Sequence, residues 1–365
     1  MSQTKAQLIA GTPTQDVIFN DATVNSLNSG PISGTRNRII NGDMRIDQRN
    51  AGASVTPADG VITYITDRWF VFEDTDGTVS AQRSTVAPDG FSYSLLVTVT
   101  STDSSLAATQ RALIEQKVEG FNFADFAFGT ASAKTVAVSF WVRSSVTGTF
   151  GGVLKNGTIN RAYVFSFTVA NANTWEYKTV TIPGDTSGTW ETGNGVGCYL
   201  GFGLATGSSF SAAAGSWGST DVSGVTGGVN LMATNGATFY VTGVQLEPGT
   251  VATPFERRSY GQELALCQRY YYEDAPLVGT GFGLTNIARA NAIHPVEMRG
   301  APTVTISNSV QFFNGGTTLT ATGGITNYST SKYLNLDIAI SGGSTTYACS
   351  ARVANTGKIT VNAEL

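Results

Sequence analysis

One stretch of the chain most constrains its fold, because a strand pattern ends in it and a helix pattern begins. Residues 239–246 carry apolar side chains among polar ones, and Gly243 indicates a bulge in this predicted strand. A Pro-Gly pair at 248–249 then breaks the regular structure. Ser259 stands three residues before Gln262, as in a capping box, which predicts that a helix begins here.

This break predicts three parts of the chain. We expect residues 38–258 to form one β-domain, and residues 259–365 to form a connecting helix followed by a smaller β-unit. Residues 1–37 precede the first strand pattern and are expected to be an extended arm. Apolar side chains recur at helical spacing from Tyr260 to Tyr272, and both sides of this helix carry apolar groups. Such a helix suits a symmetric interface, so we expect a homotrimer.

The composition favours strands over helices. Charged residues make up 13% of the 365 residues, about half of the usual fraction of roughly 25%. Glycine occurs 42 times, and serine, threonine and asparagine fill much of the remaining surface. Because these residues weaken or compete with helices, the chain suits many short strands joined by turns. The sequence therefore predicts an all-β fold, a jelly roll or β-sandwich with nine or ten strands in its larger domain.

Eight of these strands follow from alternating or continuous apolar patterns. They are expected within residues 38–50, 66–74, 92–102, 134–145, 163–170, 175–183, 196–206 and 239–246. Residues 111–120 are ambiguous, because their residue types favour a helix while Ala112, Ile114 and Val118 alternate as in a strand.

Several function classes lack their sequence features. The net charge is −4 without a basic cluster, so no footprint for nucleic-acid phosphates is present. The three cysteines are too scattered for a disulfide framework or a zinc site. No run approaches the roughly 20 apolar residues of a membrane helix, so we expect no membrane insertion. The first residues hold no signal-peptide pattern, so we expect synthesis in a cytoplasm and release by another route, such as lysis.

No catalytic or cofactor pattern emerges. His294, the single histidine, precedes Pro295 without a nucleophile motif, so a structural role is favoured over a catalytic triad. Residues 73–77 (EDTDG) resemble the start of a calcium loop, but the glutamate at the twelfth position is missing, which favours an Asp-Gly turn. We therefore expect no cofactor and no enzyme activity, and a structural calcium ion is left open.

The N-terminal arm carries one apolar run within polar sequence. Val17, Ile18 and Phe19 form the run, and Val24 and Leu27 follow it. These residues cannot bury a core alone. A disordered tail is one interpretation. We favour a docking arm that orders on the surface of a partner protein, because the run would otherwise be exposed.

Two tryptophans lie on Gly/Ser/Thr-rich loops. Trp190 is in loop 184–197 and Trp217 is in loop 207–228. Flat rings on polar loops can stack on sugar faces, so both are candidate glycan-binding residues, together with Tyr199. The alternative is that these rings plug the edge of the sandwich. The other tryptophans are expected in strands and in the core: Trp69, Trp141 and Trp175.

Six segments together resemble a known family. They are NGDMRIDQRN, TDRWF, LIEQKVEG, VSFWVRSS, the run from FYVTGVQLEPG to CQRYYY, and PVEMRGAPTV. This set is similar to bacteriophage and prophage virion appendage proteins, the tail-fibre and head-fibre proteins with a carbohydrate-binding-module-like jelly roll. The resemblance covers about residues 38–305, implies a strand for LIEQKVEG and carries no catalytic residues.

The resemblance implies a phage virion protein of fibre type, made in the host cytoplasm and exposed on the particle. It would bind other phage structural proteins through its arm and a host-surface glycan through its jelly roll. Two alternatives stay open, a capsid-decorating or tail-structural protein without receptor binding, and a glycan depolymerase. Depolymerase spikes usually show a long repetitive β-helix pattern, which this sequence lacks.

Overall fold

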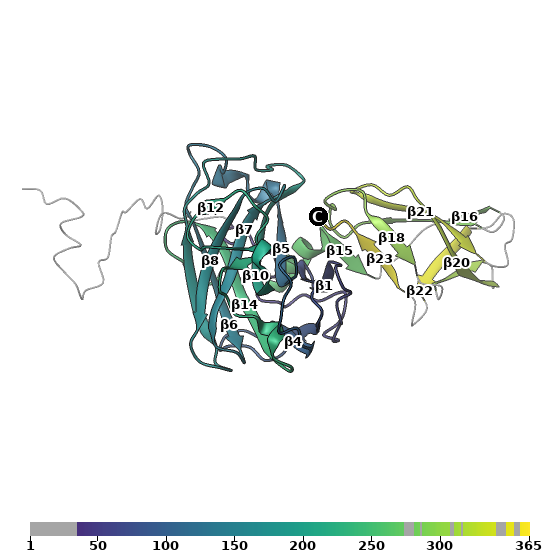
Figure 1. Ribbon diagram of the computed structural model, residues 1–365. Coiled ribbons are helices and arrows are strands. Elements are labelled where there is room, and N and C mark those ends of the chain that lie inside the picture. The colour runs from purple at the N-terminus through teal and green to yellow at the C-terminus, as the bar shows by residue number, and fades with distance from the viewer. Residues whose placement is uncertain are drawn as a thin grey trace, which may run out of the picture.

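The computed structural model divides into a larger β-domain and a smaller C-terminal unit (Figure 1). It describes residues 35–273, 281–284, 287–306, 310–314, 317–340, 348–353 and 358–365. The predicted docking residues of the arm lie outside these ranges: Val17, Ile18, Phe19, Val24 and Leu27.

The larger domain is a jelly roll of two antiparallel sheets packed face to face, which confirms the predicted all-β fold. The seven-stranded sheet has the order β1 (Thr63–Thr66), β2 (Trp69–Glu73), β5 (Arg111–Glu119), β10 (Val196–Thr206), β7 (Gly148–Asn156), β8 (Ala162–Val169) and β12 (Trp217–Gly218). The five-stranded sheet has the order β3 (Thr78–Ser84), β4 (Ser94–Ser101), β14 (Thr238–Pro248), β6 (Val136–Ser144) and β9 (Glu176–Ile182).

Short elements complete this domain. They are the parallel pair β11 (Ser211–Ala212) and β13 (Gly224–Val225), and the 3-10 turns η1 (Gly120–Asn122), η2 (Ala124–Phe126), η3 (Ser208–Phe210) and η4 (Leu231–Ala233).

The core between the two sheets follows from alternation along the strands. In β6, Val138, Phe140 and Val142 point inward and are fully buried, so Trp141 and Arg143 point to the outer face. β5 confirms the strand implied for LIEQKVEG, and it pairs with β2 and β10. Its helix-favouring residue types matter less than burial of every second side chain against the opposite sheet.

Residues 38–50 do not form the predicted strand. Asn41 has a left-handed backbone, with φ of 56°, and its side-chain amide bonds both the N–H and the carbonyl of Ile46 at 2.9 and 2.8 Å. Its carbonyl accepts the indole N–H of Trp69 at 3.0 Å. The chain turns at Asn41-Gly42, where the Met44 N–H donates to the Asn41 carbonyl at 3.1 Å, and side chains rather than a strand ladder satisfy the backbone around this turn.

The connecting helix α2 (Tyr260–Gln268) begins with the predicted capping box of Ser259 and Gln262. It ends earlier than expected, because Tyr271 and Tyr272 belong to a strand, β15 (Tyr271–Glu273). Their backbone pairs with β23 (Ile359–Asn362), the last strand of the chain. The predicted extension of the helix to residue 272 was therefore wrong at its C-terminal end.

The C-terminal unit continues from β15. Its three-stranded sheet has the order β15, β23 and β18 (Thr303–Ile306). Its closed barrel has the order β16 (Gly281–Leu284), β17 (Ile287–Ile293), β21 (Tyr333–Ile340), β20 (Thr317–Asn327), β19 (Val310–Asn314) and β22 (Ala348–Val353).

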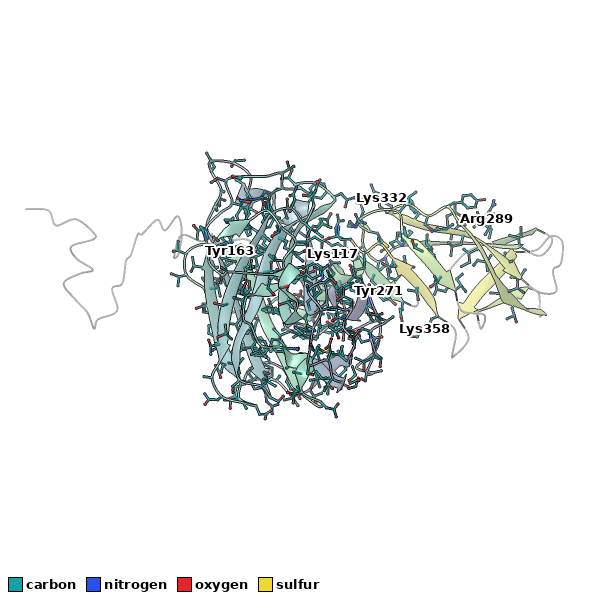
Figure 2. The ribbon with its side chains drawn as sticks, in the orientation of Figure 1. Lys117, Tyr163, Tyr271, Arg289, Lys332 and Lys358 are labelled. Carbon is teal, nitrogen blue, oxygen red and sulfur yellow. The ribbon has the colours of Figure 1, made fainter. Side chains whose placement is uncertain are left out.

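Buried charged groups join the two units. Glu119 of β5 accepts two bonds from the Arg269 guanidinium at 2.6 and 2.9 Å and one from the Tyr270 hydroxyl at 2.5 Å. Arg68 lies 3.6 Å from the centre of the Tyr270 ring and pairs with Glu364. The end of the chain lies at this junction in Figure 1, and Lys117 and Tyr271 lie there in Figure 2.

The apolar side of α2 is used within the chain. Leu264, Cys267 and Tyr270 pack in one cluster with Ile40 and Ile46 of the jelly roll. These contacts stabilise the junction and occupy side chains that had suggested a symmetric interface. The homotrimer thus stays a prediction that the helix no longer supports.

His294 has a structural position in the C-terminal unit. Its Nε2 donates to the Thr330 carbonyl at 3.0 Å, and in the neutral ring Nδ1 then accepts the Tyr272 hydroxyl at 2.6 Å. Burial lowers the pKa of His294 from its usual 6.5. The ring therefore ties β15 to the loop that precedes β21.

This pKa shift predicts a loss of stability in mild acid. Because the pKa of His294 is lower in the folded state, the unfolded state binds more protons as the pH falls below about 6.5, and the folded state is destabilised. We expect the melting temperature to fall less between pH 7.5 and 5 in His294→Gln than in the wild type, since glutamine does not titrate. Equal pH dependence of the two proteins would contradict this role.

Candidate functional site

The structure places Trp190 in the core of the jelly roll. Its side chain is 6% exposed and stacks on Phe123, with ring centres 5.4 Å apart and planes at 23°. The edge of its ring contacts Phe128 at 4.8 Å and Trp217 at 5.5 Å. A ring with so little exposure does not present a face to a sugar.

Trp217 joins the same aromatic cluster from β12. It is half-buried, and its indole N–H donates to the Pro183 carbonyl at 2.8 Å. The ring of Tyr163 lies 5.3 Å from it. The structure thus brings the two candidate glycan-binding residues Trp190 and Trp217 together. They lie at the edge of the sandwich, where they close the core, as in the alternative interpretation.

Tyr199 lies on the outer face of the seven-stranded sheet, in β10. It stands directly opposite Lys117 and Lys155, whose Nζ atoms are 5.9 and 5.4 Å from its ring centre. Burial raises the pKa of the Tyr199 hydroxyl. Tyr199 is half-buried, so it offers a sugar less surface than an exposed loop residue would.

This outer face is largely covered by the chain itself. A Cβ at Gly203 would lie 2.5 Å from the Ser223 carbonyl oxygen, so the segment around β13 lies directly on the sheet. From the other end, the Leu365 main-chain oxygen accepts the Lys117 ammonium at 2.5 Å. The buried ion pair of Lys155 and Glu115, 2.6 Å apart, fills the space between.

The outer face of the five-stranded sheet is different, because aromatic rings lie on it. Trp141 and Tyr177 are cross-strand partners in β6 and β9, with ring centres 5.4 Å apart. Trp175 lies 6.0 Å from Tyr240 of β14 in an edge arrangement. The Arg143 guanidinium lies 5.1 Å from the Tyr240 ring centre. Tyr177 is 44% exposed and the other three rings are half-buried.

A bulge extends this surface along the strands. Gly243 has a φ of 61°, and the β14 register shifts beside it, which confirms the predicted bulge. A Cβ here would lie 2.8 Å from Phe91 and 3.1 Å from Trp141, so both rings lie over this glycine. Phe91 contacts Phe255 at 5.3 Å, and the Arg257 guanidinium lies 4.6 Å from the Phe91 ring centre.

We call this continuous surface the aromatic face. It consists of Trp141, Trp175, Tyr177, Tyr240, Phe91, Phe255, Arg143 and Arg257. The expectation that Trp141 and Trp175 lie in the core was wrong. Alternation within 134–145 could have found Trp141, since Phe140 and Val142 on either side of it face inward.

The aromatic face offers side chains that are suited to binding. Half-exposed rings offer apolar surface to the C–H face of a sugar, and guanidinium groups offer hydrogen bonds to its oxygens.

Within the described ranges, no cluster of three or more His, Cys, Asp or Glu side chains could hold a metal ion. Glu73 of the predicted Asp-Gly turn instead accepts the Thr75 N–H at 2.6 Å. No described helix is long and apolar enough to cross a membrane.

Comparisons with known proteins give weak structural likeness only. No family model and no curated protein matches the sequence. The chain is similar to the enzymatically active domain of tailspike protein 4 of bacteriophage CBA120, with 12% identity and a TM-score of 0.29 over 58% of this chain and 21% of that chain. It is also similar to a family 11 carbohydrate-binding module from Clostridium thermocellum, with 14% identity and a TM-score of 0.28 over 56% of this chain and 100% of that chain.

The different burial of Trp190 and Trp141 predicts losses of stability of different size. Trp190→Ala should lower the free energy of unfolding by about 3–5 kcal/mol, because it leaves a cavity among packed rings. Trp141→Ala should lower it by about 1 kcal/mol or less, since its ring is half-exposed on the sheet. Urea denaturation of both variants measures this. Equal losses would contradict the burial of Trp190 in the core and of Trp141 on the sheet surface.

Proposed function

We propose that the protein is a non-catalytic component of a phage virion appendage, and that its jelly roll binds a glycan on the host surface through the aromatic face. One observation carries the proposal. Six aromatic rings form a continuous, partly exposed surface on one sheet, with two arginines among them. Exposed apolar surface of this kind marks a binding site, because soluble proteins otherwise keep such patches small.

The charges on this face favour a glycan that carries acidic groups. Among the described residues, neither Arg143 nor Arg257 has a carboxylate within salt-bridge distance, although most described arginines do. Arg143 donates its Nε to the Asn173 carbonyl, and Arg257 donates to the Gly90 carbonyl. Their remaining N–H groups are available for planar, bidentate contact with a sugar carboxylate.

The binding test removes two rings from the aromatic face. Trp141→Ala/Tyr177→Ala should weaken binding to acidic glycans at least about tenfold, because each ring contributes about 0.5–1.5 kcal/mol and 1.4 kcal/mol is a factor of ten. A glycan array with acidic and neutral members measures this. Phe121→Ala is the matched control, since Phe121 is 63% exposed outside the aromatic face and its loss should leave binding unchanged.

Unchanged glycan binding by the folded double variant would contradict the proposal. If the double variant instead loses incorporation into particles and wild type binds no glycan, the aromatic face contacts another virion protein. The protein would then be a decorating or tail-structural protein without receptor binding.

We also propose that the N-terminal arm attaches the protein to the virion. The structure shortens this arm, since Arg36 and Asn37 belong to the jelly roll. Their N–H groups donate to Glu256 at 3.2 and 2.8 Å, and the Asn37 side chain donates to the Val244 carbonyl at 3.1 Å. The attaching segment is therefore residues 1–34, which holds the apolar run.

Deletion of residues 1–34 tests this attachment. The melting temperature should stay within a few degrees of wild type, because the contacts of Arg36 and Asn37 are retained. Incorporation into particles should be lost. Normal incorporation of the truncated protein, measured on purified virions, would refute the role of the arm.

A further inference from the structure

An exposed groove lies on the C-terminal unit. It has a volume of about 460 Å³ and lies over the outer side of β17 and β21, next to the end of β20. Its lining residues are Asn291, Ala292, Ile293, Tyr328, Thr330, Tyr333, Leu334 and Asn335. None of these residues contributes to the aromatic face.

Three large side chains on this groove are exposed to solvent over more than half of their surface. Ile293 is 77% exposed, Tyr333 is 57% exposed and Tyr328 is 55% exposed. Ile293 and Tyr333 are direct cross-strand partners, so they form one wall of the groove. Grouping of such side chains around a hollow indicates a binding surface, whereas single exposed apolar residues need no explanation.

Two amides lie beside these rings. Asn291 and Asn335 are direct cross-strand partners, and the main chain of Asn335 is already bonded, to the Ser329 hydroxyl at 3.0 Å and the Tyr328 N–H at 2.9 Å. Its side-chain oxygen Oδ1, however, has no hydrogen-bond partner and less than 1 Å² of accessible surface. An unsatisfied buried acceptor is costly, so Asn335 beside the groove has an unused capacity to accept a hydrogen bond.

No charged side chain lines the groove. The nearest pair along the strands, Arg289 and Asp337, is closed on itself by two bonds of 2.7 Å. Figure 2 shows Arg289 and Lys332 projecting from the same side of the unit. Because the lining itself carries no charge, a ligand that fits here needs no charged group; it has an apolar face for the tyrosine rings and hydroxyl groups for the amides.

We propose that this groove binds a neutral saccharide, as a second glycan site of the same chain. The tyrosine rings contact the C–H face of the sugar, and Asn291 and Asn335 bond its hydroxyls. This site is chemically distinct from the aromatic face, where arginines favour acidic groups, and it does not depend on binding there. Two sites on one chain raise the avidity for a surface that presents both kinds of sugar.

Calorimetric titration of the full-length protein with neutral gluco-, galacto- and manno-oligosaccharides tests the groove. Tyr333→Ala should weaken binding of the neutral probe at least about fivefold, and Asn335→Ala should do the same. Tyr177→Ala is the matched control, because it removes an exposed tyrosine from the aromatic face and should leave neutral binding unchanged. Tyr333 is exposed, so its variant should fold normally.

Three results would overturn the proposal. The first is that wild type binds no neutral probe, and the second is that both groove variants bind it as well as wild type. The third is that Tyr333→Ala lowers the subunit number in light scattering, which would make the groove an interface between copies of the chain. Retained binding of acidic glycans in any of these cases would leave the function proposed for the aromatic face intact.

Discussion

A buried carboxylate, Glu263, holds together the part of the structure on which both units depend. It accepts the Asn41 N–H at 2.5 Å and pairs with Arg258, whose guanidinium also donates to the Ile39 carbonyl at 3.1 Å. One side chain on α2 thereby fixes the turn at the start of the jelly roll and the segment that leaves its last strand. Removing the carboxylate would leave the buried Asn41 N–H without its partner and would take from Arg258 the closer of its two carboxylates, which costs more than a surface ion pair is worth.

The predictable parts of this fold were those set by local patterns. Apolar patterns identified seven jelly-roll strands, which are β2, β4, β6, β8, β9, β10 and β14, and the Ser259–Gln262 pair marked the start of α2. The strand predicted within residues 38–50 was wrong, because backbone groups there form hydrogen bonds with side chains such as that of Asn41. Residue types alone do not reveal such partners. The sequence analysis predicted too long a helix, because Tyr272 pairs as a strand residue with Val361, 89 positions away, and this pairing outweighs the helical spacing of its apolar residues.

The candidate surfaces were less accessible to sequence reasoning. The alternation of side chains along β6 could have placed Trp141 on the outer face. The side chains that surround Trp141 could not be predicted in this way, because their positions depend on strand register and on the close approach of Phe91 to Gly243. The prediction that Trp190 binds a glycan relied on its Gly/Ser/Thr-rich loop, which suggests exposure. This loop instead folds back, so that the Trp190 ring packs in the core. The amide pair of Asn291 and Asn335 likewise exists only through the register of β17 with β21.

The pairing of β15 with β23 sets where the chain enters and leaves the barrel. These strands are neighbours, although residues 274–358 lie between them in sequence. Between them the chain returns to the same sheet once more, at β18, so the barrel strands leave this sheet twice, as β16–β17 and as β19–β22. The junction contacts of Tyr270 and Glu364 lie outside the barrel. A chain built this way can vary each group of barrel strands between fixed strands of the sheet, so the distal part can change in sequence without disturbing the junction.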